Sequence, residues 1–254
     1  MHTDEVSALI IEVAARLILP RFRTLDPREI HLKGPGDLVT IADREAEAAL
    51  TDALRAAEPG VLVVGEEASF DDPSLESRVG EVARAWVVDP VDGTRNFAHG
   101  SPDFGVMVAE VERGLPVRSW IWQPVHQRLY VAERGGGVRL DGQVLPALAA
   151  RCRPYRLEVY GGRRRTPAPG LVLGHTHGSC AIDYPRLLAG EVDALGYRSL
   201  HPWDHLPGTL MVTELGGFAG MDGAPYQAGT PGRVLLTAAS RELHDVVDAA
   251  LRHQ

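Results

Sequence analysis

The stretch Trp86-Val87-Val88-Asp89-Pro90-Val91-Asp92-Gly93-Thr94 sets an apolar run directly before two carboxylates and a Gly-Thr pair. The run has the short length and β-branched composition of a buried strand, which would deliver Asp89 to the strand's carboxyl end. Pro90 has no N–H and a fixed φ, so we expect it to end the strand ladder and turn the chain. Such a turn can bring the carboxylates of Asp89 and Asp92 and the carbonyl of Val91 to one side.

Three converging oxygens are typical of a site for a divalent cation and a phosphate. Mg2+ prefers oxygen ligands and keeps several waters, so these groups suit a catalytic ion that awaits a phosphate. Backbone N–H groups at a turn or helix start bind anions, and Gly93 lets an anion approach closely. A solvated turn is the alternative, because Asp, Pro and Gly are common turn residues. A second strand-like run, residues 61–64, also ends in acids, at Glu66 and Glu67, which favours the site.

Four motifs together resemble the inositol monophosphatase family of Mg2+-dependent, lithium-sensitive phosphomonoesterases. They are Gly65-Glu66-Glu67, Asp89-Pro90-Val91-Asp92-Gly93-Thr94-Arg95-Asn96-Phe97, Trp203-Asp204 and Glu214-Leu215-Gly216-Gly217. The resemblance implies an α/β fold, a layered α/β/α/β sandwich of the sugar-phosphatase type. We expect two packed halves: residues 1–150, an α+β half with the metal site, and residues 151–254, a smaller α/β half that completes the active site.

The resemblance also implies the roles of the site residues. The expected metal ligands are Glu66, Asp89, the carbonyl of Val91, Asp92 and Asp204, with Asp89 bridging two ions. The cofactor would be two or three Mg2+ ions, with Mn2+ as an alternative metal. Glu66 and Thr94 would take or relay the proton of an attacking water that the ions activate, and Asp43 would orient Thr94. Without the resemblance, Asp43 is only an acid that interacts with a helix dipole.

The substrate side departs from the family pattern. We expect the substrate to contact Gly93, Thr94, Ser179, Tyr197, Arg198 and Asp204. In inositol-selective members an acid that binds sugar hydroxyls lies seven positions before the aspartate of the Trp-Asp motif. Tyr197 stands there in this chain and Arg198 follows it, which favours a substrate with extra negative charge or an aromatic group. The small phosphate monoester therefore stays open: it is inositol-phosphate-like, histidinol phosphate, a sugar phosphate, or a 3′-phosphonucleotide or bisphosphate.

Three alternative hypotheses belong to other classes. A haloacid dehalogenase type of phosphatase uses a tighter Asp-x-Asp spacing and a downstream lysine, whereas Lys33 is the only lysine here. A zinc or manganese site could use the imidazoles of residues 175, 177, 201 and 205; we expect instead that Trp203 and His205 pack around Asp204. The third alternative is a regulatory, protein-binding role with vestigial catalysis. The basic run Arg163-Arg164-Arg165 is expected to be a solvated loop.

Composition narrows the function further. The 254 residues carry a formal net charge of −8, whereas a general nucleic-acid binder needs a basic face. Two cysteines and no charged-then-apolar leader disfavour a disulfide-stapled secreted protein, so the cytoplasm is the expected location. No apolar run approaches the roughly 20 residues needed to span a bilayer. The expected partner is a small phosphorylated substrate, with no nucleic acid and no membrane, and the resemblance implies a homodimer.

The hydrophobic pattern predicts the order of elements. Two amphipathic helices are expected first, one over residues 4–19 with Thr3 as its N-cap and one that starts near Asp43. An antiparallel meander should follow over residues 104–111, 117–123 and 128–133, with Trp120 and Trp122 in the core. The last part alternates helices and strands, including a helix after Asp204 and a final helix behind Ser240.

Overall fold

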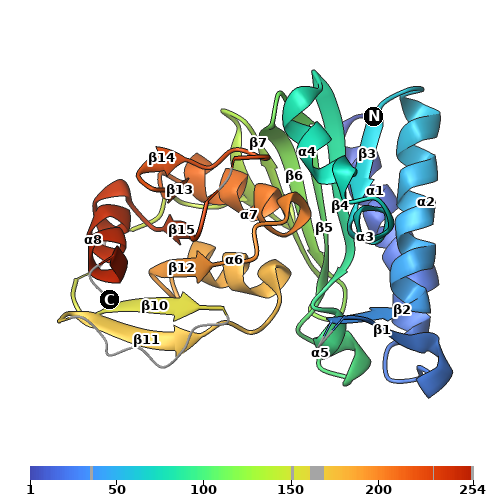
Figure 1. The fold of residues 1–254 in the computed structure, drawn as a ribbon, viewed down its shortest axis with the longest axis horizontal. Coiled ribbons are helices and arrows are strands. Elements are labelled where there is room, and N and C mark those ends of the chain that lie inside the picture. The colour runs from blue at the N-terminus through green and yellow to red at the C-terminus, as the bar shows by residue number, and fades with distance from the viewer. Residues whose placement is uncertain (35–36, 150–151, 161–168, 231, 253–254) are drawn as a thin grey trace.

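Two large β-sheets and three layers of helices alternate through the molecule in this computed structural model (Figure 1). The structure describes residues 1–34, 37–149, 152–160, 169–230 and 232–252. Helices α1 (Thr3–Val13) and α2 (Ile41–Ala57) cover the outer face of a seven-stranded sheet. Helices α6 (Cys180–Leu188) and α7 (Pro202–Glu214) lie between this sheet and a six-stranded sheet, whose far face carries α8 (Arg241–Arg252). The predicted layered α/β sandwich is confirmed, and α8 adds a fifth layer to the predicted α/β/α/β order.

The seven-stranded sheet has the order β3-β4-β5-β6-β7-β8-β9. Its strands β3 and β4 are parallel, and the others pair antiparallel. The predicted meander is confirmed as β5, β6 and β7, and both Trp120 and Trp122 are buried. The bounds are β3 Leu62–Gly65, β4 Arg84–Asp92, β5 Gly105–Glu112, β6 Leu115–Gln123, β7 Arg128–Glu133, β8 Gly137–Leu140 and β9 Gln143–Val144.

The six-stranded sheet has the order β11-β10-β12-β15-β13-β14 and mixes parallel and antiparallel pairs. Its strands are β10 Tyr155–Val159, β11 Leu171–His175, β12 Ala194–Tyr197, β13 Phe218–Met221, β14 Ala224–Pro225 and β15 Leu235–Ala238. The division of the chain at residue 150 stays a prediction. Residues 163–165, for which a solvated loop was expected, lie outside the described residues.

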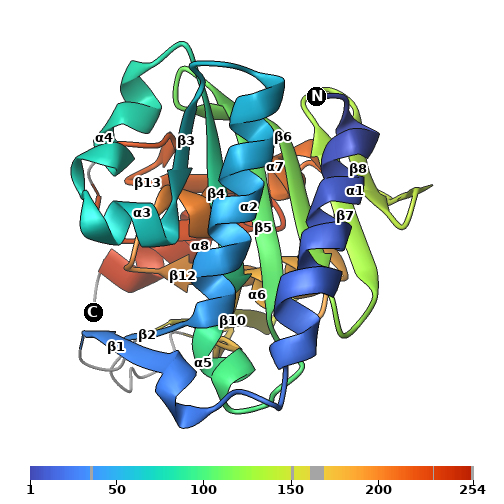
Figure 2. The same ribbon diagram turned by 90° about the vertical axis from the view of Figure 1, so that its right-hand side faces the viewer.

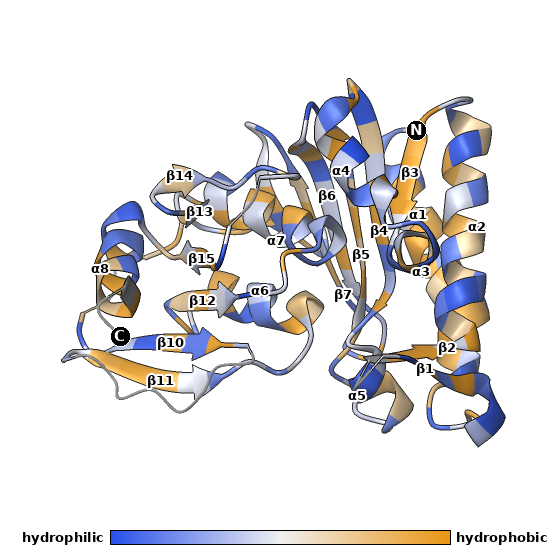
Figure 3. Ribbon diagram, in the orientation of Figure 1, coloured by the Kyte–Doolittle hydropathy of each residue, from blue (hydrophilic) through white to orange (hydrophobic). Residues whose placement is uncertain are grey.

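Helix α2 shows why the sequence folds this way locally. Ala46, Leu50 and Leu54 recur at a spacing of four residues and are all buried against the sheet, while Arg44, Asp52 and Arg55 on the other side are exposed (Figure 3). The helix begins after Thr40, whose side chain accepts a hydrogen bond from the Ala42 N–H. Asp43 is the third helical residue, so its carboxylate also lies at the positive end of the helix dipole.

Three local predictions were wrong. Pro90 does not end the ladder: β4 runs on to Asp92, and two residues bulge opposite one between Asp89 and Asp92. Thr3 is the first residue of α1 rather than its N-cap, because His2 holds the extended backbone at that end. Asp204 lies inside the first turn of α7, since Pro202 already has the φ that a helix start needs.

Short elements complete the site edge of the first sheet. A hairpin of β1 (Ile30–Gly34) and β2 (Asp37–Thr40) precedes α2. Helices α3 (Glu66–Asp71), α4 (Ser74–Glu81) and α5 (Thr94–Ala98) follow β3 and β4. A π-helical turn, Ala14–Ile18, and two 3₁₀ turns, Leu19–Arg21 and Pro27–Glu29, connect α1 to the hairpin. Within the described ranges, every helix falls short of the length and apolarity that crossing a bilayer requires.

Candidate active site

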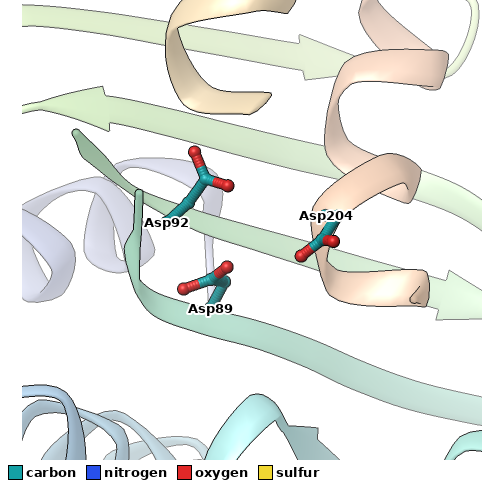
Figure 4. Close-up of side chains that lie close together, drawn as sticks. All are labelled: Asp89, Asp92 and Asp204. Atoms are coloured by element: carbon teal, nitrogen blue, oxygen red, sulfur yellow. The ribbon is translucent and has the colours of Figure 1, made fainter. Parts of the chain in front are cut away.

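Three aspartates from two distant segments converge at one edge of the first sheet. Asp89 and Asp92 come from the bulged end of β4, and Asp204 comes from the first turn of α7 (Figure 4). One carboxylate oxygen of each lies within 4.8 Å of the others, and we call the three residues the aspartate triad. The bulge at Pro90 matters here, because it lets two acids three residues apart point to one place.

Burial and mutual repulsion make the triad costly to ionise in the absence of a cation. Burial, then the nearby carboxylates of Glu66 and its other neighbours, raises the pKa of Asp89 well above its ordinary value. Burial and the charges of Asp92 and Glu66 do the same for the pKa of Asp204, and burial raises the pKa of Asp92 to about 6. An all-oxygen, multiply charged donor set of this kind fits hard divalent ions such as Mg2+. The residues present therefore fit the expected metal.

Ser179 and the start of α6 hold Asp92 in place. The Ser179 hydroxyl and the Ala181 N–H, at 2.7 Å, both donate to Asp92 Oδ2. Gly93 adopts a φ of +87°, and a Cβ there would lie 2.8 Å from the Cβ of Ser179. Only glycine tolerates both the left-handed backbone and this approach. Ser179 thus lines the cleft and supports Asp92, and its contact with a substrate stays a prediction.

Asp43 and Thr94 are brought together as the resemblance implied. Thr94 Oγ1 lies 2.9 Å from Asp43 Oδ1 and 3.1 Å from the carbonyl oxygen of Val91, so its one proton can go to either acceptor. Asp43 is fully buried, and this burial raises its pKa to about 6 even though Thr40 and Thr94 donate to it. The Thr94 hydroxyl therefore faces the predicted metal-binding carbonyl from one side and a buried acid from the other.

Lys33, the chain's single lysine, is a site residue that sequence reasoning missed. Its Nζ lies 2.7 Å from Glu66 Oε1 and 2.6 Å from Glu67 Oε1, and its side chain is only 2% exposed. Burial alone would lower the pKa of Lys33, but the charges of Glu66 and Glu67 outweigh it and raise that pKa. Glu66 lines the same cleft as the triad, although its carboxylate is engaged by Lys33. No local sequence pattern indicates that Lys33 is buried beside Glu66.

Glu47 is a second residue that sequence reasoning missed. Its carboxylate accepts hydrogen bonds from the Glu67 N–H at 2.7 Å and the Ala68 N–H at 2.8 Å, at the start of α3. A Cβ on Gly65 would lie 2.2 Å from the carboxylate carbon of Glu47, so the glycine makes room for this contact. The contact fixes the turn that carries Glu66. In the sequence, the only indication of this contact is Gly65, directly before Glu66 and Glu67.

Tyr197 and Arg198 lie in different surroundings. Tyr197 lines the cleft but is 3% exposed, and its hydroxyl donates to Asp183 Oδ2 at 3.0 Å. Arg198 is exposed and is not among the described residues that line the cleft, so its contact with a substrate stays a prediction. The cleft measures about 1080 Å³ and also includes Gly93, Thr94 and the triad.

The histidines do not form a metal centre in the described part of the chain. There, the aspartate triad is the one group of three or more metal-ligating side chains that converges. Instead, His205 Nε2 donates to the Ser199 carbonyl at 2.7 Å, and His205 Nδ1 lies 3.1 Å from the Tyr184 hydroxyl. Burial lowers the pKa of His205 to about 4. Trp203 is 3% exposed and stacks on His201 at 4.9 Å, so it anchors the helix start beside Asp204.

Comparisons with known proteins agree with this geometry. Residues 2–253 match the model of the inositol monophosphatase family. The chain is 32% identical over 233 residues to an inositol-1-monophosphatase of Rhizobium meliloti, with 85% of each chain covered. It is 34% identical over 219 residues to the Nus factor SuhB of Pseudomonas aeruginosa, with 80% of this chain and 79% of the other covered. Among solved structures, a Thermotoga maritima IMPase shares the fold with a TM-score of 0.78 at 24% identity, over 98% of both chains. The chain belongs to the inositol monophosphatase family.

Proposed function

We propose that this protein is a Mg2+-dependent phosphatase that hydrolyses a small phosphate monoester. The observation that carries the proposal is the aspartate triad, because three carboxylates within 4.8 Å of one another, two of them buried and the third partly buried, form an all-oxygen site that a cation would stabilise. Membership of a metal-dependent phosphatase family supports it. The proposed metal ligands are Glu66, Asp89, the Val91 carbonyl, Asp92 and Asp204, which would hold two or three Mg2+ ions, with Mn2+ as a substitute.

The bound ions would supply charge neutralisation for the phosphate and activation of the attacking water. The chain's own residues would bind the phosphate and orient the attacking water. Backbone N–H groups of Gly93 and Thr94 would hold phosphate oxygens at the start of α5. Thr94 Oγ1, already shared between Asp43 and the Val91 carbonyl, would accept a proton from water and pass it toward Asp43. Glu66 would take this role once its carboxylate leaves Lys33.

The test is a phosphatase assay on the purified protein with a panel of phosphate monoesters. We expect phosphate release with Mg2+, weaker release with Mn2+, and none after chelation by EDTA. Lithium should inhibit the reaction. No release from any ester over a wide Mg2+ range would overturn the proposal. Light scattering of the same sample would test the homodimer that the resemblance implies.

A regulatory role is the second candidate, because relatives of similar identity are named Nus factor SuhB. In this reading the fold acts through a protein partner and hydrolysis is secondary. A strain that lacks the gene separates the two. If Asp92→Asn restores growth as well as the native protein does, the regulatory role is favoured; if it fails while being expressed and folded, hydrolysis is the function that the cell needs.

A further inference from the structure

The proposed metal ligand Asp92 is held by a helix that does not belong to its own sheet. Both donors to Asp92 Oδ2 come from the start of α6: the hydroxyl of Ser179, the residue before the helix, and the N–H of Ala181. Helix α6 lies between the two large sheets (Figure 1), whereas Asp92 ends β4 of the first sheet. The orientation of this carboxylate therefore depends on how α6 docks against the first sheet.

Two glycines at the edge of the first sheet allow this docking to be close. A Cβ on Gly93 would lie 2.8 Å from the Cβ of Ser179, and a Cβ on Gly105 would lie 2.6 Å from the Cβ of Ala181. Gly93 follows Asp92 in the chain, and Gly105 is the partner of Asp92 in β5. A larger residue at either position would push the helix start away. The glycines therefore let α6 rest directly on the backbone around Asp92.

Two side-chain amides from the first sheet hold the start of α6 on both sides of Ser179. Asn96, the only asparagine in the chain, lies in α5 and donates from Nδ2 to the carbonyl of His177 at 2.9 Å. Gln123 is the last residue of β6, is 4% exposed, and donates from Nε2 to the carbonyl of Ala181 at 2.8 Å. We call Asn96 and Gln123 the amide clamp. Its two bonds bracket the segment that supplies both donors to Asp92.

Asn96 lines the cleft, yet its amide is committed to the backbone. An asparagine amide has two N–H donors. One is used by the carbonyl of His177 and the other by the carbonyl of Asp103, at 2.7 Å. The His177 peptide is also held on its other side, because its N–H donates to Asp183 Oδ1 at 2.8 Å. Asn96 thus fixes a loop rather than offering its N–H groups to a phosphate.

We propose, building on the phosphatase function above, that the two residues of the amide clamp are positioning residues for the metal site. They hold the start of α6 against the first sheet, and the docked helix start orients the Asp92 carboxylate for a cation. Groups that orient a metal ligand typically change metal affinity by about 10- to 100-fold when they are removed. The clamp makes cation binding at Asp92 depend on the docking of α6.

The test measures the Kd for Mg2+ by calorimetry, so it does not depend on turnover. We expect Asn96→Ala and, separately, Gln123→Met to raise this Kd by about 10-fold or more. Combined with Asp92→Asn, either substitution should cause no further loss of Mg2+ affinity, because the clamp acts through Asp92. The matched control is Gln227→Ala. It removes another amide-to-carbonyl bond, 2.9 Å long and made to Arg113 outside the cleft lining, and should leave the Kd unchanged.

The outcomes separate the clamp from the phosphatase function. An unchanged Kd in both clamp variants would overturn the positioning role and leave the phosphatase function standing. A further loss of affinity in the Asp92→Asn background would overturn it too, since the damage would then not pass through Asp92. Loss of the native circular dichroism spectrum in both clamp variants, but not in Gln227→Ala, would replace positioning with a purely structural role. No Mg2+ binding by the native protein would overturn the phosphatase function, and the clamp's role with it.

Discussion

Replacing Asp92 with asparagine tests the electrostatics of the aspartate triad directly. Two unit charges 4.8 Å apart repel by about 3.5 kcal/mol at an effective dielectric constant of about 20. Burial independently raises the pKa of Asp92 from 3.8 to about 6, and that difference corresponds to about 3 kcal/mol at neutral pH. The asparagine oxygen can still accept from Ala181. The metal-free variant should therefore be more stable than the native protein by about 3 kcal/mol, or about 6–12 °C in Tm.

The pH dependence of this gain has a definite sign. Because the folded state raises the pKa of Asp92, it binds this proton more tightly than the unfolded state does between about pH 4 and pH 6. The ionised Asp92 carboxylate thus destabilises the folded state to its full extent above about pH 6 and not at all well below pH 4. The stability gain of Asp92→Asn in EDTA should fall to about half at pH 5. Thermal denaturation at pH 5 and pH 7.5, followed by circular dichroism, measures both values.

Magnesium should reverse the order of stability. The native protein should gain Tm with Mg2+, whereas Asp92→Asn should gain little and lose most phosphatase activity, while its melting curve stays cooperative. The matched control is Asp193→Asn, which changes an aspartate that is 2% exposed and outside the triad. It should leave the Mg2+ shift and turnover unchanged. A metal-free Asp92→Asn that melts below the native protein would refute the repulsion argument, and near-normal turnover would refute the ligand assignment.

Three further predictions concern the supports of the site. Gly208→Ala places a Cβ 2.1 Å from the ring of the buried Tyr184, so the free energy of unfolding should fall by about 1–3 kcal/mol or more. An unchanged urea midpoint would contradict the close packing of α6 and α7. Glu47→Ala leaves the buried Glu67 N–H and the partly buried Ala68 N–H without their acceptor, so the free energy of unfolding should fall by about 1–3 kcal/mol. Mg2+ should also bind more weakly by calorimetry, and an unchanged Mg2+ affinity would argue against a positioning role for Glu47. Burial raises the pKa of Asp183 to about 7, so ionisation of this acid lowers the free energy of unfolding as pH rises from about 4 to 7. Asp183→Asn should lose less stability than the native protein over this pH range in urea titrations. The same pH dependence of stability in both proteins would disprove this cost.

Short-range chemistry made the first sheet and its two covering helices predictable. The four-residue spacing of Ala46, Leu50 and Leu54 and the two-residue alternation of Trp120 and Trp122 both report which face is buried. The bulge at Pro90 was not predictable in the same way. A proline's missing N–H removes one ladder bond, but whether the ladder stops or resumes depends on the neighbouring strand, and β5 pairs with Asp92 again through Gly105.

The second half was harder to read, because its elements are short and its contacts lie far apart in sequence. The burial of Tyr197 and its hydrogen bond to Asp183 depend on α6 packing beside β12, which no local pattern states. Arg198 follows Tyr197 directly, yet it lies in the bend after β12, where it is exposed and outside the cleft lining. One of two adjacent expected contacts therefore lines the cleft and the other does not.

The sequence alone pointed to the kind of chemistry, since Asp89, Asp92 and Thr94 lie within six residues at the end of one strand. It also indicated the family, because its four motifs occur along the chain in the family's order. Tertiary structure decided how far that chemistry is supported: Asp204 joins the triad from α7, and Lys33 and Glu47 reach Glu66 and its helix from separate elements. The physical reason is that charge repulsion, burial and cleft shape act through space, between groups that the order of residues does not place side by side.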